Sequence, residues 1–120
     1  MSTIMKAAKA LSDETRLRMI NLLLQKECCV CEVMQVLKIS QTRASRNLNL
    51  LRDAGFLKVR KDGLWSYYSI VRKSPHDPIS SLLAAVAQGL RNDPCGHKDI
   101  KNLKKAKRLR PRSCSDRKSP

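Results

Sequence analysis

Apolar residues recur at helical spacing in five stretches of this chain, and polar residues that favour helix starts precede several of them. Ser12, Ser40 and Asp77 stand where an N-cap is expected, and Gly55 stands where a helix would end in a left-handed residue. Arg16 and Arg18, early in the second stretch, are expected to face solvent. The predicted helices cover about residues 3–11, 13–25, 30–37, 41–54 and 78–90.

The third and fourth predicted helices are separated by residues 38–40 alone, a connection typical of a helix-turn-helix motif. In the fourth, Ala44, Leu48 and Leu51 fall on one face, so they are expected to point inward. Polar side chains on the other face suit contacts to bases and phosphates in the major groove, although an ordinary solvated helix face would look similar. The candidate DNA-binding residues of this helix are Gln41, Thr42, Arg43, Ser45, Arg46 and Asn49.

Beyond the fourth helix, the pattern becomes that of a β-hairpin. Apolar and basic residues alternate over 57–60, Asp62-Gly63 favours a tight turn, and residues 64–70 suit a strand. A helix-turn-helix followed at once by a basic hairpin predicts a winged helix, in which Arg60 and Lys61 are candidate contacts to the DNA backbone. The expected fold is a mainly α winged helix-turn-helix, with about five helices and a two-stranded β wing.

The last predicted helix carries an apolar stripe that is wide for a domain of this size. The stripe could close the core or pair with a second copy of the chain, and we favour the second, a homodimer. Residues 1–94 would then form the DNA-binding, sensing and dimerisation domain. Residues 95–120 are basic and contain proline and serine, so they are expected to be a tail that is disordered without DNA.

The net charge of +15, from 25 Lys and Arg against 10 Asp and Glu, favours a polyanionic partner. No run is long and apolar enough for a membrane span, and the first residues lack the features of a signal peptide. We therefore expect a cytoplasmic protein that binds double-stranded DNA and no membrane. The two histidines fall in the linker and the tail, so no catalytic set can be grouped and enzyme activity is not expected. A DNA-packaging protein would fit the charge, but it would leave the cysteines without a role.

Three of the five cysteines, Cys28, Cys29 and Cys31, fall within four positions. Core packing would explain one such cysteine, but the clustering favours metal binding or redox chemistry. Thiolates select soft, thiophilic ions. In a helix, Cys29 and Cys31 would point about 200° apart, so both could reach one ion only if the first turn unwound. Ion binding is therefore expected to distort a helix that packs against the recognition helix.

Three segments carry a resemblance to a known family and occur in the same order as in that family. They are residues 11–20 (Leu-Ser-Asp-Glu-Thr-Arg-Leu-Arg-Met-Ile), the recognition segment 40–57 and the hairpin segment 62–68. Together they resemble the ArsR/SmtB family of metalloregulators, and the resemblance covers about residues 3–91. It implies a homodimeric winged-helix repressor that leaves its operator DNA when an inducer binds, with no cofactor needed for DNA binding. Asn47 stands where this family usually shows histidine.

Residues 27–33, Glu-Cys-Cys-Val-Cys-Glu-Val, further resemble the thiolate box of the arsenite-responsive members, Glu-Leu-Cys-Val-Cys-Asp-Leu-Cys. Cys29 and Cys31 match the first two cysteines of that box. Met34 stands at the third, and Cys28 offers a substitute thiol. The resemblance implies that arsenite or antimonite is the inducer and that Cys28, Cys29 and Cys31 hold it.

Two alternatives remain for the inducer. A cadmium-, lead- or zinc-responsive repressor of the same family would add nitrogen or oxygen ligands. The second site of the zinc sensors needs Asp and His on the last helix, and residues 79–90 contain neither. A thiol redox switch would instead join Cys28 and Cys31 in a reversible bond. Cys95 could lend a metal ligand across the dimer, whereas Cys114 is given no role.

Overall fold

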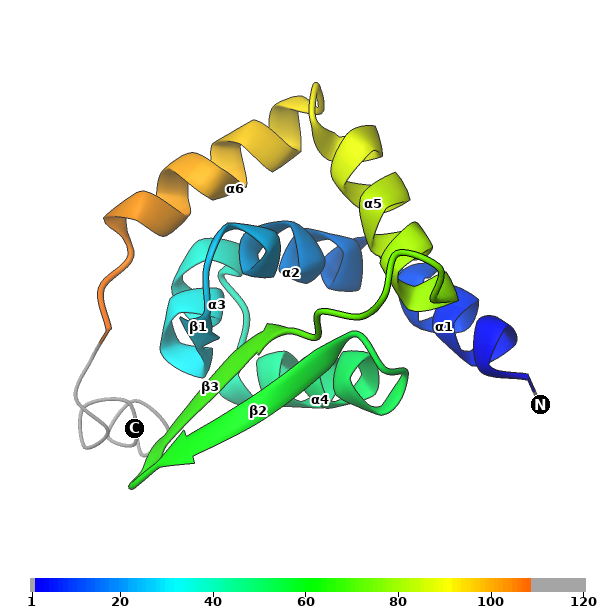
Figure 1. Ribbon diagram of the computed structural model, residues 1–120. Coiled ribbons are helices and arrows are strands. Elements are labelled where there is room, and N and C mark those ends of the chain that lie inside the picture. Colours follow the sequence, from blue (N-terminus) through cyan, green and yellow to red (C-terminus); the bar gives the residue numbers. More distant parts are fainter. Residues whose placement is uncertain (1, 109–120) are drawn as a thin grey trace.

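Residues 2–108, the part of the chain that the computed structural model describes, form six helices and a three-stranded antiparallel sheet (Figure 1). The helices are α1 (Thr3–Leu11), α2 (Glu14–Gln25), α3 (Val30–Leu37), α4 (Gln41–Asp53), α5 (Pro78–Leu90) and α6 (Pro94–Lys105). The strands are β1 (Cys28–Cys29), β2 (Leu57–Asp62) and β3 (Trp65–Ile70). The expected mainly α winged helix-turn-helix is confirmed, with one more helix and one more strand than the pattern indicated.

Side-chain caps determine where the helices begin. Ser40 Oγ accepts a hydrogen bond from the N–H of Arg43 at 3.1 Å, which starts α4 at the predicted residue. Asp13 accepts one from the N–H of Arg16 at 3.0 Å and starts α2. The N-cap predicted at Ser12 is therefore wrong by one residue. Ser12 instead ends α1, and its hydroxyl donates to a carbonyl in the last turn of that helix.

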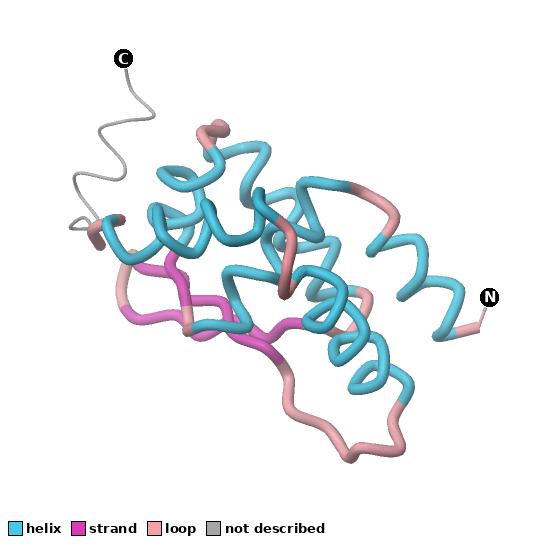
Figure 2. The backbone as a smooth tube through the Cα atoms, turned by 90° about the horizontal axis from the view of Figure 1, so that it is seen from above, coloured by secondary structure: helices cyan, strands magenta, loops and turns pink. Residues whose placement is uncertain are grey.

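Helix α2 lies at the centre of the molecule, and the other elements surround it. In Figure 1, α5 and α6 arch over α2 on the side away from β2 and β3. Figure 2, seen from above, shows the strands gathered along one side of the helices. Met19, Ile20 and Leu22 of α2 are fully buried, as are Leu48 of α4 and Phe56 beyond it. This shared core fixes the position of α4 relative to the rest of the domain.

The wing forms as predicted and gains a third strand. Strands β2 and β3 pair from Leu57 and Ile70 to Asp62 and Trp65, and Gly63 takes the positive φ of 63° that the tight turn requires. The added strand, β1, pairs with the other side of β3. A strand of two residues is too short to show an alternating pattern, so its pairing could not be read from the sequence.

The expectation of a disordered tail from residue 95 is wrong for residues 95–105, which belong to α6. Asp93 caps this helix by accepting from the N–H of Cys95 at 2.8 Å, and Pro94 occupies its first turn. Asp99 and Leu103 are buried. The basic composition of this segment favoured disorder, and its few apolar positions were too short a stripe to indicate a helix. Residues 109–120, with Cys114, lie outside the described part of the chain.

The apolar stripe of α5 is only partly buried in the core of the domain. Ile79 and Leu83 are buried in the core, whereas Leu82, Val86 and Leu90 are only half-buried. On α1, which packs beside α5, Ile4 and Met5 are exposed. Apolar surface thus remains on these two helices after the core has closed.

Candidate nucleic-acid interface and cysteine site

The recognition helix α4 sorts its residues as its pattern predicted. Ala44, Leu48 and Leu51 are fully buried. Of the candidate DNA contacts, three are exposed, namely Thr42, Arg43 and Arg46, and three are half-buried, namely Gln41, Ser45 and Asn49. The helix therefore presents hydroxyl and guanidinium groups to solvent near its N-terminus, the end that recognition helices direct at base edges.

Some of these candidates have bonds that the sequence did not indicate. The Asn49 side chain accepts a hydrogen bond from the hydroxyl of Tyr68 at 3.0 Å, which joins α4 to strand β3. Arg43 donates to Thr15 Oγ1 at 3.2 Å. The side-chain oxygen of Gln41 is buried without a hydrogen-bond partner among residues 2–108. Asn49 thus has a structural contact to the wing as well as its predicted position on the reading helix.

Arg16 does not face solvent as expected, because it joins α1 to α4. Its Nε donates to Ala10 O at 2.6 Å, and one terminal nitrogen donates to Asn47 Oδ1 at 2.9 Å. Asn47 in turn donates to Arg43 O at 2.9 Å. An amphipathic pattern predicts which face a residue occupies but not that a long side chain will reach a neighbouring helix, so no sequence signal marked this network.

The wing carries three exposed basic residues, Lys58, Arg60 and Lys61. Arg60 is also paired within the chain. It donates to Glu27 Oε1 at 2.9 Å, and its Cζ lies 4.4 Å from the centre of the Tyr67 ring. The ion pair lowers the pKa of Glu27, the hydrogen bond from Arg60 being the main cause. Glu27 immediately precedes the cysteine segment, so the wing and that segment are in direct contact.

The cysteine segment, residues 28–31, runs from strand β1 into the first turn of α3. Cys28 pairs with Tyr68 and Cys29 with Tyr67, and all three cysteines of the segment are buried. Cys29 is the extended N-cap residue of α3, with φ −84° and ψ 163°, so the helical angle predicted between Cys29 and Cys31 does not apply. Within residues 2–108 no three His, Cys, Asp or Glu side chains are grouped to hold a metal ion.

The thiols of the segment are not in their ligand form in this conformation. Burial raises the pKa of Cys28 to about 12, and the charge of Glu32 contributes to the increase. Burial also raises the pKa of Cys29. Cys28 and Cys29 are free thiols, whereas Cys31 is disulfide-bonded. Ion binding by all three would require reduction of Cys31, loss of the thiol protons and movement of the segment out of the core.

Glu32, which sequence reasoning missed, holds the cysteine segment in place. Its carboxyl group accepts from the backbone N–H of Cys29 at 3.0 Å, from Arg108 Nε at 2.9 Å and from Lys26 Nζ. Burial opposes ionisation, but these hydrogen bonds outweigh it and lower the pKa of Glu32. The signal was present in the sequence, because Glu32 stands three residues after the N-cap, the acidic position of a capping box.

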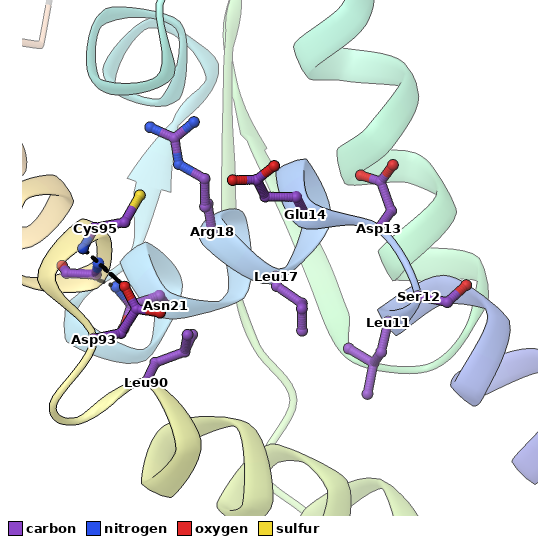
Figure 3. A pocket seen from close by; sticks show the side chains of 11 residues that line it. Leu11, Ser12, Asp13, Glu14, Leu17, Arg18, Asn21, Leu90, Asp93 and Cys95 are labelled. Carbon is purple, nitrogen blue, oxygen red and sulfur yellow. Dashed lines mark hydrogen bonds between the residues drawn. The ribbon is translucent and has the colours of Figure 1, made fainter.

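Cys95 lies in a different part of the molecule. It is exposed and lines a pocket of about 310 Å³ beside Arg18, Asn21 and Asp93 (Figure 3). Arg18 is not turned freely to solvent as expected, because it donates to both carboxylate oxygens of Asp99, at 2.7 and 2.9 Å. Cys95 is in the first turn of α6, whereas Arg108, which contacts Glu27 and Glu32, follows the last turn of this helix. A helix of 12 residues spans about 18 Å, so Cys95 and the cysteine segment are not brought together within one chain.

Comparison with known proteins tests these features. The profile "Bacterial regulatory protein, arsR family" matches residues 13–59. The arsenic resistance transcriptional regulator ArsR2 of Pseudomonas putida is 42% identical over 86 residues, which cover 68% of this chain and 75% of ArsR2. This chain belongs to the ArsR family. It is also 48% identical to the arsenical resistance operon repressor of Escherichia coli, over 58% of each chain.

Further relatives include a regulator named for cadmium resistance and another named for arsenic resistance. The cadmium resistance regulator CadC homolog of Staphylococcus aureus is 43% identical over 56% of each chain. The match to ArsR1 of P. putida, at 44% identity, covers 68% of this chain but only 61% of that relative. The members named here are transcriptional regulators, in agreement with the expectation that the chain is not an enzyme.

Solved structures confirm the winged-helix fold. HlyU from Vibrio cholerae superposes with a TM-score of 0.63 at 26% identity, over 74% of this chain and 89% of HlyU. The DNA-binding domain of Mb0332 from Mycobacterium bovis, described as a homodimeric winged helix-turn-helix, gives a TM-score of 0.63 at 27% identity, over 77% and 82% of the two chains. None of the helices within residues 2–108 is both long and apolar enough to cross a membrane.

Proposed function

We propose that this protein is a cytoplasmic transcriptional repressor that binds operator DNA as a homodimer and releases it when Cys28, Cys29 and Cys31 bind trivalent arsenic or antimony. The observation that carries the proposal is that two residues of the cysteine segment, Cys28 and Cys29, form a strand of the wing sheet. A change at the thiols therefore acts on an element that contacts DNA in winged-helix proteins.

DNA binding would use two surfaces. Thr42, Arg43 and Arg46 are exposed on α4 and would enter the major groove, with Gln41, Ser45 and Asn49 beside them. Lys58, Arg60 and Lys61 of the wing would contact phosphates. Because the Glu27–Arg60 ion pair is partly solvent-exposed, a DNA phosphate could replace Glu27 as the partner of Arg60 at little cost.

Dimerisation would use α1 and α5. Ile4 and Met5 of α1 are exposed, and Leu82 and Val86 of α5 are only half-buried, so a second copy could cover this apolar surface. The solved structure of Mb0332, a structural neighbour, is described as homodimeric. A two-fold dimer would place two copies of α4 on an inverted repeat with half-sites about 10 bp apart.

Release would follow from the contacts of β1. For Cys28 and Cys29 to bind one ion with Cys31, β1 must leave its pairing with Tyr67 and Tyr68. Tyr68 also holds Asn49 of α4 through its hydroxyl. The ion would thus bind only a conformation in which the wing and α4 have lost a shared contact. That is the difference in affinity between two states that coupling requires.

Three thiolates suit trivalent arsenic and antimony, because soft ions select sulfur ligands. Relatives named for arsenic resistance support this inducer. A second candidate, cadmium, is favoured by the similarity to a CadC homolog and by the buried Glu32 carboxylate next to Cys29, an oxygen donor of the kind such ions accept. A redox switch through a Cys28–Cys31 bond has less support, since Cys28 is a free thiol here.

The test is an operator-release titration of fully reduced protein with arsenite, antimonite, cadmium, zinc and, in a separate arm, peroxide. We expect release at the lowest concentrations by arsenite and antimonite, its loss in Cys29→Ser and Cys31→Ser, and no change in the control Cys95→Ser. Release by cadmium alone would favour the second candidate. No release by any of the ions would refute the proposal, and release by peroxide alone would point to redox control.

A further inference from the structure

The chain beyond α6 folds back onto the cysteine segment. In Figure 1 the end of α6 descends beside α3 and β1. The backbone of Lys107 makes two hydrogen bonds with the side chain of Gln35 on α3, at 3.1 Å and 2.6 Å. Arg108 donates to Glu32 Oε1 at 2.9 Å and to the carbonyl oxygen of Glu27 at 2.8 Å. We call residues 106–108 the clasp.

Buried contacts along α6 fix the position of the clasp. Asp99 is 2% exposed and forms a two-point ion pair with Arg18 of α2. Asn21 of α2 donates to Gly96 O at 3.2 Å, and Leu103 lies in the core. Because α2 holds α6 at these positions, the residues that follow α6 lie against α3 and beside the cysteine segment.

The clasp and the cysteine segment share one buried group. The Glu32 carboxyl has no exposed surface, and it receives Arg108 from the clasp and the N–H of Cys29 from the segment. The guanidinium of Arg108 also lies 4.8 Å from the centre of the Tyr67 ring, and Tyr67 is the residue that pairs with Cys29. Arg108 therefore contacts two direct partners of Cys29, namely the Glu32 carboxyl that accepts its N–H and the Tyr67 residue that pairs with it in the sheet.

Movement of Cys29 must therefore disturb the clasp. If Cys29 leaves β1 to bind an ion, Glu32 loses the N–H that it accepts, and Tyr67 loses the strand that fixes its backbone. Glu32 and Tyr67, two of the three residues that contact Arg108, then change position. Conversely, a closed clasp stabilises the conformation in which Cys28 and Cys29 are buried.

Resting on the proposed function, we infer that the clasp locks the cysteine segment in its DNA-binding conformation and is displaced when that segment binds its ion. Glu32 is the positioning residue that connects the two. The clasp would set the concentration of ion at which the repressor responds, because the free energy needed to open the clasp lowers the apparent affinity for the ion. Displacement of the clasp would also change the conformation of the residues that follow α6 when the inducer binds.

The experiment compares full-length, reduced wild-type protein with Arg108→Gln and with the matched control Lys104→Gln, which removes an exposed charge from α6. One arm measures arsenite affinity by titration. A second measures alkylation of Cys28 and Cys29 by iodoacetamide, read by mass spectrometry of the peptide spanning residues 27–38. A third follows hydrogen exchange of the Lys107 amide, which is bonded to Gln35, with and without arsenite.

We expect Arg108→Gln to bind arsenite about fivefold more tightly and to alkylate about fivefold faster, the effect of losing one partly exposed ionic contact. Lys104→Gln should match the wild type, and arsenite should increase exchange at Lys107. Equal affinities and alkylation rates in the two variants, or exchange unchanged by bound arsenite, would overturn the clasp. Absence of arsenite binding to the wild type would instead refute the proposed function, while the alkylation rates would still decide whether Arg108 closes the segment.

Discussion

Replacing Tyr68 by Phe isolates the contact through which the cysteine segment would act on α4. Tyr68 is 5% exposed and pairs with Cys28 in the sheet, so Phe keeps its packing and its place in β3. Only the hydroxyl, which donates to Asn49 at 3.0 Å, is removed. The variant therefore tests whether the Tyr68–Asn49 hydrogen bond transmits the effect of ion binding to α4, without altering the packing of the wing.

The magnitude follows from the environment of the bond. A neutral hydrogen bond contributes about 1 kcal/mol, and Asn49 is half-buried, so water can partly replace the lost donor. If the bond is present in the DNA-binding conformation and absent in the ion-bound one, its removal lowers the coupling free energy by about 1 kcal/mol. Arsenite would then weaken operator binding by a factor about fivefold smaller than in the wild type.

The assay is operator binding by fluorescence anisotropy, with and without saturating arsenite, at fixed salt. The matched control is Tyr67→Phe, which removes a hydroxyl from the neighbouring residue of the same strand and leaves the ring beneath Arg60 in place. We expect Tyr67→Phe to keep the wild-type response. If Tyr68→Phe responds to arsenite as strongly as the wild type, the path from β1 through Tyr68 to Asn49 does not transmit the signal.

Further changes test other parts of the molecule. Arg46→Ala should cost about 1–3 kcal/mol of operator-binding free energy and relax base preference at one position. Lys61→Ala should weaken binding to all DNA sequences alike and reduce the slope of affinity against salt by about one. Salt titrations on operator and random DNA measure both effects, and an equal loss on the two DNAs would contradict base reading by Arg46. Asp99→Ala should lower the free energy of unfolding by about 2 kcal/mol in urea titrations, because Arg18 loses a buried partner, and an unchanged value would show that the Arg18–Asp99 ion pair adds no stability. The raised pKa of Cys28, about 12, means that the folded state keeps a proton which the unfolded chain releases near pH 9, so the resulting stability is complete below pH 9 and is lost as the pH rises toward 12. Cys28→Ala should therefore show a shallower loss of stability over that interval, and parallel pH profiles for the two proteins would contradict the assignment.

The sequence was sufficient to predict the elements that carry strong periodicity. Helix α4 begins at the predicted residue because Ser40 is a capping residue, and Leu48 and Leu51 are buried because their spacing matches a helical face. The wing turn at Gly63 followed from the Asp-Gly pair. These features depend on local preferences, which a single sequence expresses directly.

What the sequence did not reveal depends on contacts between distant segments. Strand β1 exists because β3 offers an edge to Cys28 and Cys29, and the buried carboxylate of Glu32 is bound by Arg108, 76 residues away in the sequence. The charge of α6 suggested disorder, although its Asp99 meets Arg18 across 81 positions. The three cysteines were found from their clustering, but their burial and protonation depend on this tertiary environment.

The network around Arg16 bears on which DNA spacings the protein can accept. One guanidinium connects the last turn of α1, where it meets Ala10 O, to Asn47 in α4. If α1 lies in the dimer interface, this link fixes each reading helix relative to the two-fold axis. Adding one base pair between half-sites shifts the second one by about 3.4 Å and turns it by about 34°. A domain tied in this way cannot follow that rotation, so the operator should tolerate base changes in its centre far better than a change in its length.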